Sequence, residues 1–149
     1  MELSDSLYTE LVSLTDAGNT LLDEGDIDGA ITLFEQALEL VPAPKQQWEA
    51  ATWIYAAIGD SLFFKEEYES SLNSFLDARK SAGGISNPFL LLRIGHCYLE
   101  LNDPDNAGEY LQQALMLEGE DIFEEEEEKY LEFTYRCMRE DSEGTDVGH

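Results

Sequence analysis

Three segments of the chain place small and large residues at the same spacing, and this repeat constrains the fold more than any other feature. The segments start from Gly18, Gly59 and Gly95. The residues at offsets of 3, 12, 16, 19 and 24 from each glycine match in kind. They are Leu21, Ala30, Phe34, Ala37 and Pro42; Leu62, Ser71, Phe75, Ala78 and Gly83; and Tyr98, Ala107, Leu111, Ala114 and Gly119.

The shared offsets have a physical meaning if each segment is a pair of packed helices. Glycine has no side chain and lets a second helix approach closely. The small residues at offsets 12 and 19 serve the same purpose, and the large residues at offsets 3 and 16 fill the space between the helices. The proline or glycine at offset 24 ends the unit. The pattern therefore predicts three stacked helical hairpins.

This pattern resembles the tetratricopeptide repeat (TPR) over residues 11 to 121. The resemblance implies an all-α fold, a short TPR-like superhelix with three helix-turn-helix repeats at about 11–44, 52–85 and 88–121. A capping helix at about 121–140 is expected to cover the apolar face of the last repeat. We expect one domain over 1–140, a disordered tail over 141–149, and seven helices at about 5–24, 27–41, 44–64, 67–82, 88–101, 104–118 and 121–140.

The repeats are unevenly spaced. Gly18 and Gly59 are 41 residues apart, and Gly59 and Gly95 are 36 apart, whereas tandem TPRs repeat every 34. Seven extra residues are almost two helical turns and rotate the helix face by only about 20°. We therefore predict that the first helix of the second repeat is extended and starts near Pro44.

The net charge excludes several classes of partner. Thirty-three acidic residues against 8 basic ones give a formal charge of -25. Such a chain repels nucleic acid phosphates and anionic lipid head groups, and attracts basic proteins. Acidity that only maintains solubility is the alternative.

No sequence motif indicates catalysis, a metal or a cofactor. The chain lacks a glycine-rich phosphate loop, a zinc motif and a nucleophile elbow. Cys97 and Cys137 show no metal-type spacing, and we interpret them as reduced core residues. The N-terminus lacks the features of a secretory signal, and no apolar run has the length of a membrane span. We expect a cytoplasmic, non-catalytic protein without metal or cofactor.

The TPR resemblance implies that the first helix of each repeat lines a concave binding face. The partner-binding residues expected there are Asn19, Asp23, Trp53, Asp60, Phe63, Phe64, Phe89, Leu92, His96 and Glu100. Aromatic and acidic side chains suit a ligand with apolar anchors and basic residues. The alternative is that these aromatics pack against the capping helix. TPRs that grip a carboxylate use groove lysines, which are missing here.

A run of five glutamates forms a second candidate surface, an acidic knob of Glu124, Glu125, Glu126, Glu127 and Glu128. We place this run at the start of the capping helix, where the helix dipole favours negative charge. It contacts a basic protein surface in one interpretation, and is a solvated helix start in the other.

The leading hypothesis is a protein-binding module of the immunity type. Small, acidic, irregular TPR proteins resemble the inhibitors of bacterial toxin–immunity pairs, which implies a basic toxin domain as the partner. The alternatives are a TPR chaperone of a type III-like secreted apolar protein, and a general scaffold or adaptor.

Overall fold

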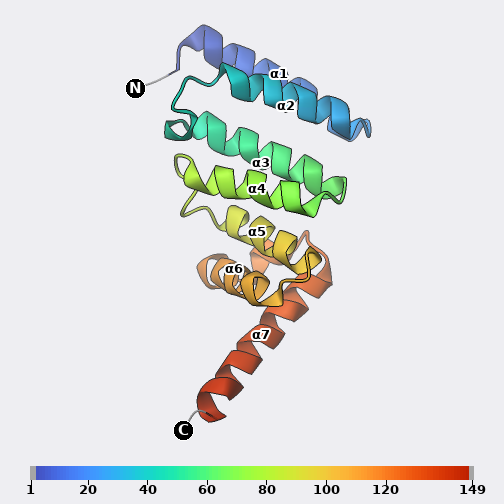
Figure 1. Cartoon of the computed structure of the whole chain (residues 1–149), viewed down its shortest axis with the longest axis vertical. Coiled ribbons are helices and arrows are strands. Elements are labelled where there is room, and N and C mark those ends of the chain that lie inside the picture. The colour runs from blue at the N-terminus through green and yellow to red at the C-terminus, as the bar shows by residue number, and fades with distance from the viewer. Residues whose placement is uncertain (1–2, 148–149) are drawn as a thin grey trace. The chain divides into compact units, whose positions relative to one another are not determined.

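The computed structural model describes the backbone of residues 3–147 and the side chains of residues 3–141, and every regular element in this range is helical (Figure 1). The chain divides into two compact units, Met1–Ser86 and Asn87–His149. The first unit holds α1 (Asp5–Asp23), α2 (Ile27–Leu40), the 3-10 turn η1 (Lys45–Gln47), α3 (Glu49–Phe64) and α4 (Tyr68–Lys80). The second holds α5 (Pro88–Glu100), α6 (Pro104–Glu118), the 3-10 turn η2 (Glu120–Phe123) and α7 (Glu128–Val147).

The helices begin where the sequence supplies capping residues. Asp26 accepts a hydrogen bond from the Gly29 N–H at 2.9 Å and caps α2. Asn87 and Asp103 cap α5 and α6 in the same manner, each directly before a proline in the first turn. The seven predicted α-helices are thus confirmed, and most of their bounds agree with the prediction.

The helices pair as the shared offsets predict. Helix α1 packs on α2, α3 on α4, and α5 on α6. A Cβ atom added at Gly18 would lie 2.6 Å from the Phe34 ring, and one at Gly59 would lie 2.8 Å from the Phe75 ring. At Gly95 it would lie 2.6 Å from Leu111. These distances are too short for a real Cβ, so each glycine lets the large residue at offset 16 press against the first helix.

Ser71 stands where the other two repeats have alanine, and the structure explains why it is tolerated. The side chain is fully buried, and its hydroxyl donates a hydrogen bond of 2.7 Å to the Gly59 carbonyl. A buried hydroxyl without a partner would be destabilising. The hydrogen bond removes this penalty and joins α4 to α3 at their closest approach.

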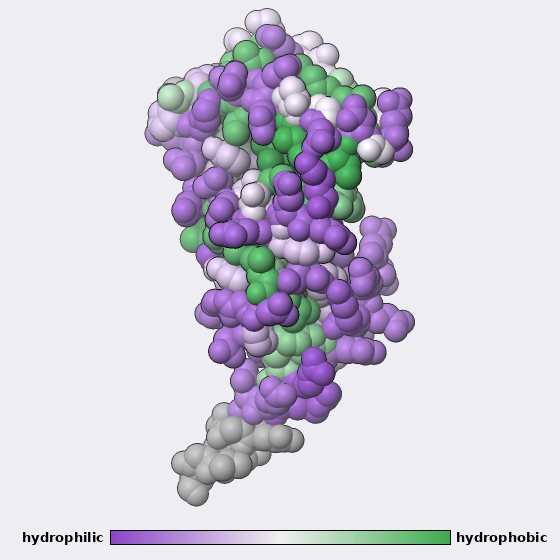
Figure 2. Space-filling model, turned by 45° about the vertical axis from the view of Figure 1, so that its right-hand side comes forward, coloured by the Kyte–Doolittle hydropathy of each residue, from purple (hydrophilic) through white to green (hydrophobic). Residues whose placement is uncertain are grey.

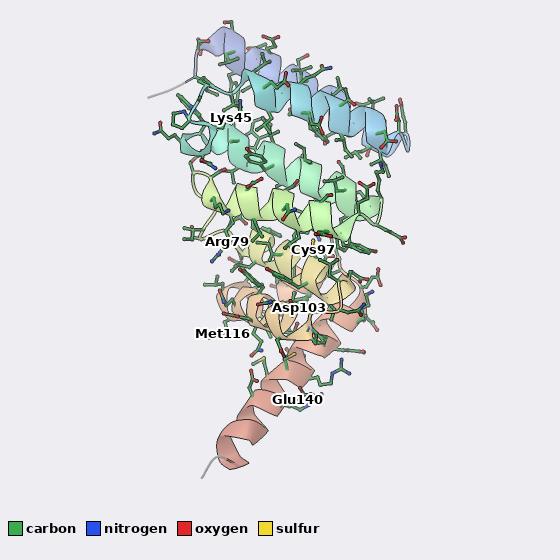
Figure 3. The ribbon with its side chains drawn as sticks, viewed as in Figure 1. Lys45, Arg79, Cys97, Asp103, Met116 and Glu140 are labelled. Atoms are coloured by element: carbon green, nitrogen blue, oxygen red, sulfur yellow. The ribbon has the colours of Figure 1, made fainter. Side chains whose placement is uncertain are left out.

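The extended helix predicted from Pro44 is wrong, because α3 begins at Glu49. The preceding residues form η1 and an extended Trp48. Lys45, labelled in Figure 3, donates from Nζ to the Leu38 and Val41 carbonyls at 2.8 and 2.9 Å. The Trp48 indole donates to the Pro42 carbonyl at 2.9 Å. These contacts satisfy the end of α2 and hold the inserted residues out of the helix.

The capping helix also differs from the prediction at both ends. Helix α7 begins at Glu128 rather than near 121, because Ile122 and Phe123 are buried in η2 before the chain turns into the helix. It continues to Val147, so the tail expected to be disordered from 141 is helical over 141–147. Residues 148–149 lie outside the described residues. The chain divides into two compact units, so the single domain over 1–140 stays a prediction.

We predict that Gly59→Ala lowers the free energy of unfolding by about 1–3 kcal/mol, because the added methyl overpacks against Phe75. At an exposed helix position, Gly→Ala would instead raise the free energy of unfolding by roughly 1 kcal/mol, because alanine has the higher helix propensity. Urea unfolding followed by circular dichroism measures it. In a Phe75→Leu background the same substitution should cost less, and a stabilising Gly59→Ala would contradict the packing role of this glycine.

Candidate protein-binding site

In the second unit, α7 covers much of the face of α5 that was predicted to bind a partner. Leu92 and His96 are each only 1% exposed. The His96 ring stacks on Tyr130 of α7, with ring centroids 3.7 Å apart, and Leu92 joins a core cluster with Phe123, Tyr130 and Phe133. The burial of Leu92 and His96 argues against a direct contact with a partner, and their role in binding stays a prediction. Their surroundings are completed within the unit by side chains of η2 and α7.

Glu100, the last predicted residue of α5, is also engaged by α7. Lys129 Nζ lies 2.6 Å from its Oε1, and the Tyr130 hydroxyl donates to the same oxygen at 2.8 Å. Burial raises the pKa of Glu100, but the hydrogen bonds from Lys129 and Tyr130 outweigh burial and lower the pKa below its usual value. The carboxylate thus stabilises the attachment of α7 to α5.

His96 is uncharged at neutral pH. Burial, together with the positive charges of Arg93 and Lys129, lowers its pKa to about 3. Its Nδ1 lies 3.9 Å from the Glu126 carboxylate, and because the imidazole is neutral this contact is not an ion pair. A neutral, buried ring that stacks on Tyr130 is a packing element.

The glutamate run divides into an internal residue and an exposed group. Glu126 is half-buried and accepts from the Arg93 guanidinium at 2.5 Å. Glu124, Glu125, Glu127 and Glu128 are exposed. Only Glu128 belongs to α7, so the prediction that the run forms the first helical turn is wrong.

Two of the exposed glutamates, Glu124 and Glu125, border a hollow that contains an apolar anchor, which we name the acidic hollow. Its volume is about 360 Å³, and it is lined by Phe89, Arg93, Glu118, Asp121, Ile122, Glu124, Glu125 and Glu126. The Phe89 side chain is 61% exposed. The structure therefore places one of the predicted aromatic residues, Phe89, beside part of the glutamate run, which the sequence analysis treated as a separate surface.

In the first unit the predicted residues remain accessible to different degrees. Asn19 and Asp23 of α1 are exposed, and Phe64 at the end of α3 is 66% exposed. Asp60 and Phe63 are half-buried, and the Phe63 ring packs edge-on against Tyr68 at 5.0 Å between centroids. Their role in binding stays a prediction.

Trp53 belongs to a second hollow, which lies at the starts of α1 and α3 and which we name the aromatic hollow. Its volume is about 580 Å³, and it is lined by Leu3, Asp5, Tyr8, Gln47, Trp48, Glu49, Ala50, Trp53 and Ala82. Tyr8 is 54% exposed and Trp53 is 37% exposed. Sequence reasoning missed Tyr8 and Trp48. The signal was present, since Trp48 lies among the seven residues that exceed a regular repeat.

Polar side chains cover most of the face shown in Figure 2, with apolar side chains exposed between them. Among the described helices, none is long and apolar enough to cross a membrane. Within the same part of the chain, His, Cys, Asp and Glu do not gather in a group of three or more that could hold a metal.

The comparisons with known proteins identify a helical-repeat protein. Sequence models of the tetratricopeptide repeat match residues 15–54 and 90–121. The chain therefore contains tetratricopeptide repeats, and the stretch 55–89, where α4 carries Ser71 in the alanine position, lies between the two matches. No functionally curated protein matches the sequence.

Solved structures support the same fold. The N-terminal domain of stress-induced protein-1 from C. elegans is similar with a TM-score of 0.68 and 13% identity, over 91% of this chain and 99% of that chain. The second TPR domain of human RPAP3, solved with the HSP70 peptide SGPTIEEVD, has a TM-score of 0.68 and 16% identity. The match covers 89% of this chain and 98% of that chain. YrrB, a TPR protein with an unusual peptide-binding site, has a TM-score of 0.65 and 25% identity. The match covers 86% of this chain and 58% of that chain.

The buried histidine predicts a specific pH dependence of stability. Between pH 6.5 and about 3 the unfolded chain binds a proton at His96 that the folded chain does not, so this residue lowers stability as the pH falls. Because of His96, the free energy of unfolding should be about 2 kcal/mol lower at pH 5 than at pH 7. His96→Gln should remove this part of the pH dependence in urea unfolding, and equal slopes for both proteins would contradict it.

The division of the glutamate run predicts unequal effects of the same substitution. Glu126→Gln should lower the free energy of unfolding by about 1 kcal/mol, because Arg93 loses a half-buried, charge-assisted hydrogen bond. Glu124→Gln, at an exposed position two residues away, should change it by less than about 0.5 kcal/mol. Thermal unfolding of the two variants tests this, and equal losses would argue against an internal role for Glu126.

Proposed function

We propose that this protein is a non-catalytic binding module that holds a folded, basic protein against its acidic surface, as an immunity-type inhibitor does with a basic toxin domain. The proposal rests on which side chains of α5 are buried and which are exposed in the second unit. Leu92 and His96 are covered by α7, while Phe89 remains exposed beside Glu124 and Glu125. An extended peptide has little access to the covered positions, whereas a folded surface can contact an exposed ring and its carboxylates.

The charge of the chain favours a basic partner over an acidic peptide. The HSP70 peptide bound by the human RPAP3 domain, SGPTIEEVD, has three acidic residues and no basic one. A chain with a net charge of -25 would repel such a ligand at long range. The same field accelerates the encounter with a basic protein, and this acceleration decreases as salt screens the charges.

The experiment begins with affinity capture from the native cell lysate at low salt, elution with a salt gradient and identification of the bound protein. A folded basic protein whose toxicity is suppressed by coexpression of this chain supports the proposal. A secreted apolar protein that is captured unfolded and resists salt would favour the chaperone alternative. A large, folded, non-toxic assembly would favour a scaffold.

Neutralisation of the exposed part of the glutamate run tests which surface meets the partner. The variant replaces Glu124, Glu125, Glu127 and Glu128 with glutamine and leaves Glu126 paired with Arg93. We expect association at low salt to slow by about tenfold or more, with a smaller salt dependence, because these charges no longer steer the encounter. Stopped-flow or surface plasmon resonance measures the rate.

A matched control separates local from overall charge. Glu10, Asp16, Glu35 and Glu39 are exposed residues of α1 and α2 outside both hollows. Their replacement by glutamine or asparagine changes the net charge by the same amount, and association should slow much less. If the two variants slow association equally, only the total charge matters and the glutamate run is not the contact surface.

A further inference from the structure

The aromatic hollow of the first unit combines accessible rings with carboxylates. Tyr8 and Trp53 present 54% and 37% of their surface to solvent, and Trp48 is half-buried beside them. Asp5 and Glu49 contribute exposed carboxylates to the same lining. Of the described residues that line the hollow, none is basic. Aromatic faces carry partial negative charge, so rings and carboxylates together attract a cation.

We infer that this hollow is a subsite for an arginine side chain on the surface of the partner. A guanidinium is planar and weakly hydrated, so it can stack on an indole while its N–H groups donate to a carboxylate. A volume of about 580 Å³ leaves room for one such side chain and part of its backbone. An ammonium group, as a compact and strongly hydrated charge, gains less from stacking.

The position of the carboxylates supports a site for a cation rather than an anion. Asp5 is the first residue of α1 and Glu49 the first of α3. The N-terminus of a helix carries partial positive charge and would otherwise favour an anion. The two carboxylates reverse the sign of the local charge, and the rings beside them supply contact area that an acidic cluster alone would lack.

The hollow exists because of the irregular spacing of the repeats. The inserted segment folds into η1 and an extended Trp48 instead of lengthening α3. The Gln46 carbonyl accepts from the Ala82 N–H at 2.9 Å, and the Thr52 hydroxyl donates to the Ala82 carbonyl at 2.7 Å. These hydrogen bonds fix Ala82 against the start of α3, so this wall of the hollow is held by the fold.

The test uses the intact chain and a small probe. Trp48 and Trp53 are the two tryptophans of the sequence, and both line the hollow, so intrinsic fluorescence reports on this site. N-acetyl-L-arginine amide is titrated at constant ionic strength, with the neutral isostere N-acetyl-L-citrulline amide as the control ligand. We expect a saturable change with the arginine compound and a much weaker one with citrulline.

A pair of variants with equal net charge locates the binding. Asp5→Asn with Glu49→Gln should weaken binding of the arginine compound by roughly three- to tenfold, because the cation loses its carboxylates. Asp16→Asn with Glu35→Gln removes two exposed charges elsewhere in the same unit, and should leave the affinity within about twofold. Equal binding of citrulline, an unsaturable response, or equal losses in the two variants would overturn the inference.

This inference rests on the proposed function for its biological meaning, but the two can fail separately. If the arginine compound binds and no basic protein partner is captured, the proposed function fails and the subsite stands. If a basic partner binds through the glutamate run and the arginine compound does not enter the hollow, this inference fails alone.

Discussion

The close contact between a glycine in one helix and a large side chain in the next is the interaction on which the rest of the structure depends. It occurs at Gly18 with Phe34, Gly59 with Phe75, and Gly95 with Leu111. Because each large side chain is fully buried at that contact, it sets the distance between the paired helices. The small residues at offsets 12 and 19, also fully buried, allow the same approach along the rest of the pair. Capping residues and turns then determine only where each helix begins and ends.

The two units use this scaffold in different ways. In the second unit, α7 supplies Tyr130 and Phe133 to the core with Leu92, and the acidic hollow surrounds the exposed Phe89 mainly with carboxylates. In the first unit, the inserted residues keep Trp48 out of α3 and leave Tyr8 and Trp53 accessible. The acidic hollow therefore offers mainly carboxylates around a single ring, and the aromatic hollow offers several rings with two carboxylates. Both combinations favour a partner that is basic and partly apolar.

Sequence reasoning predicted the helix pairs because their contacts repeat at fixed offsets, and it predicted the starts of α5 and α6 because Asn87-Pro88 and Asp103-Pro104 are local signals. It failed at the starts of α3 and α7. Those boundaries depend on tertiary contacts, such as Lys45 with the α2 carbonyls and the burial of Phe123, which no local pattern reveals. The same distinction between local signals and tertiary contacts applies to the candidate site. Phe89 and the exposed glutamates were identified as candidates from the sequence, whereas the burial of His96 and the pairing of Glu126 with Arg93 required the structure.

Half of the basic side chains contact carbonyl or carboxylate oxygens within the fold, so the chain's few positive charges are partly engaged internally. Lys45 binds the end of α2, Lys65 pairs with Asp28, Arg93 with Glu126, and Lys129 with Glu100. These contacts involve four of the 8 basic residues. The remaining carboxylates repel one another, and this repulsion destabilises the compact state. A basic protein that binds the folded chain relieves the repulsion, so binding and stability are thermodynamically coupled. The same charge excess that limits the stability of the free protein would thus strengthen its complex.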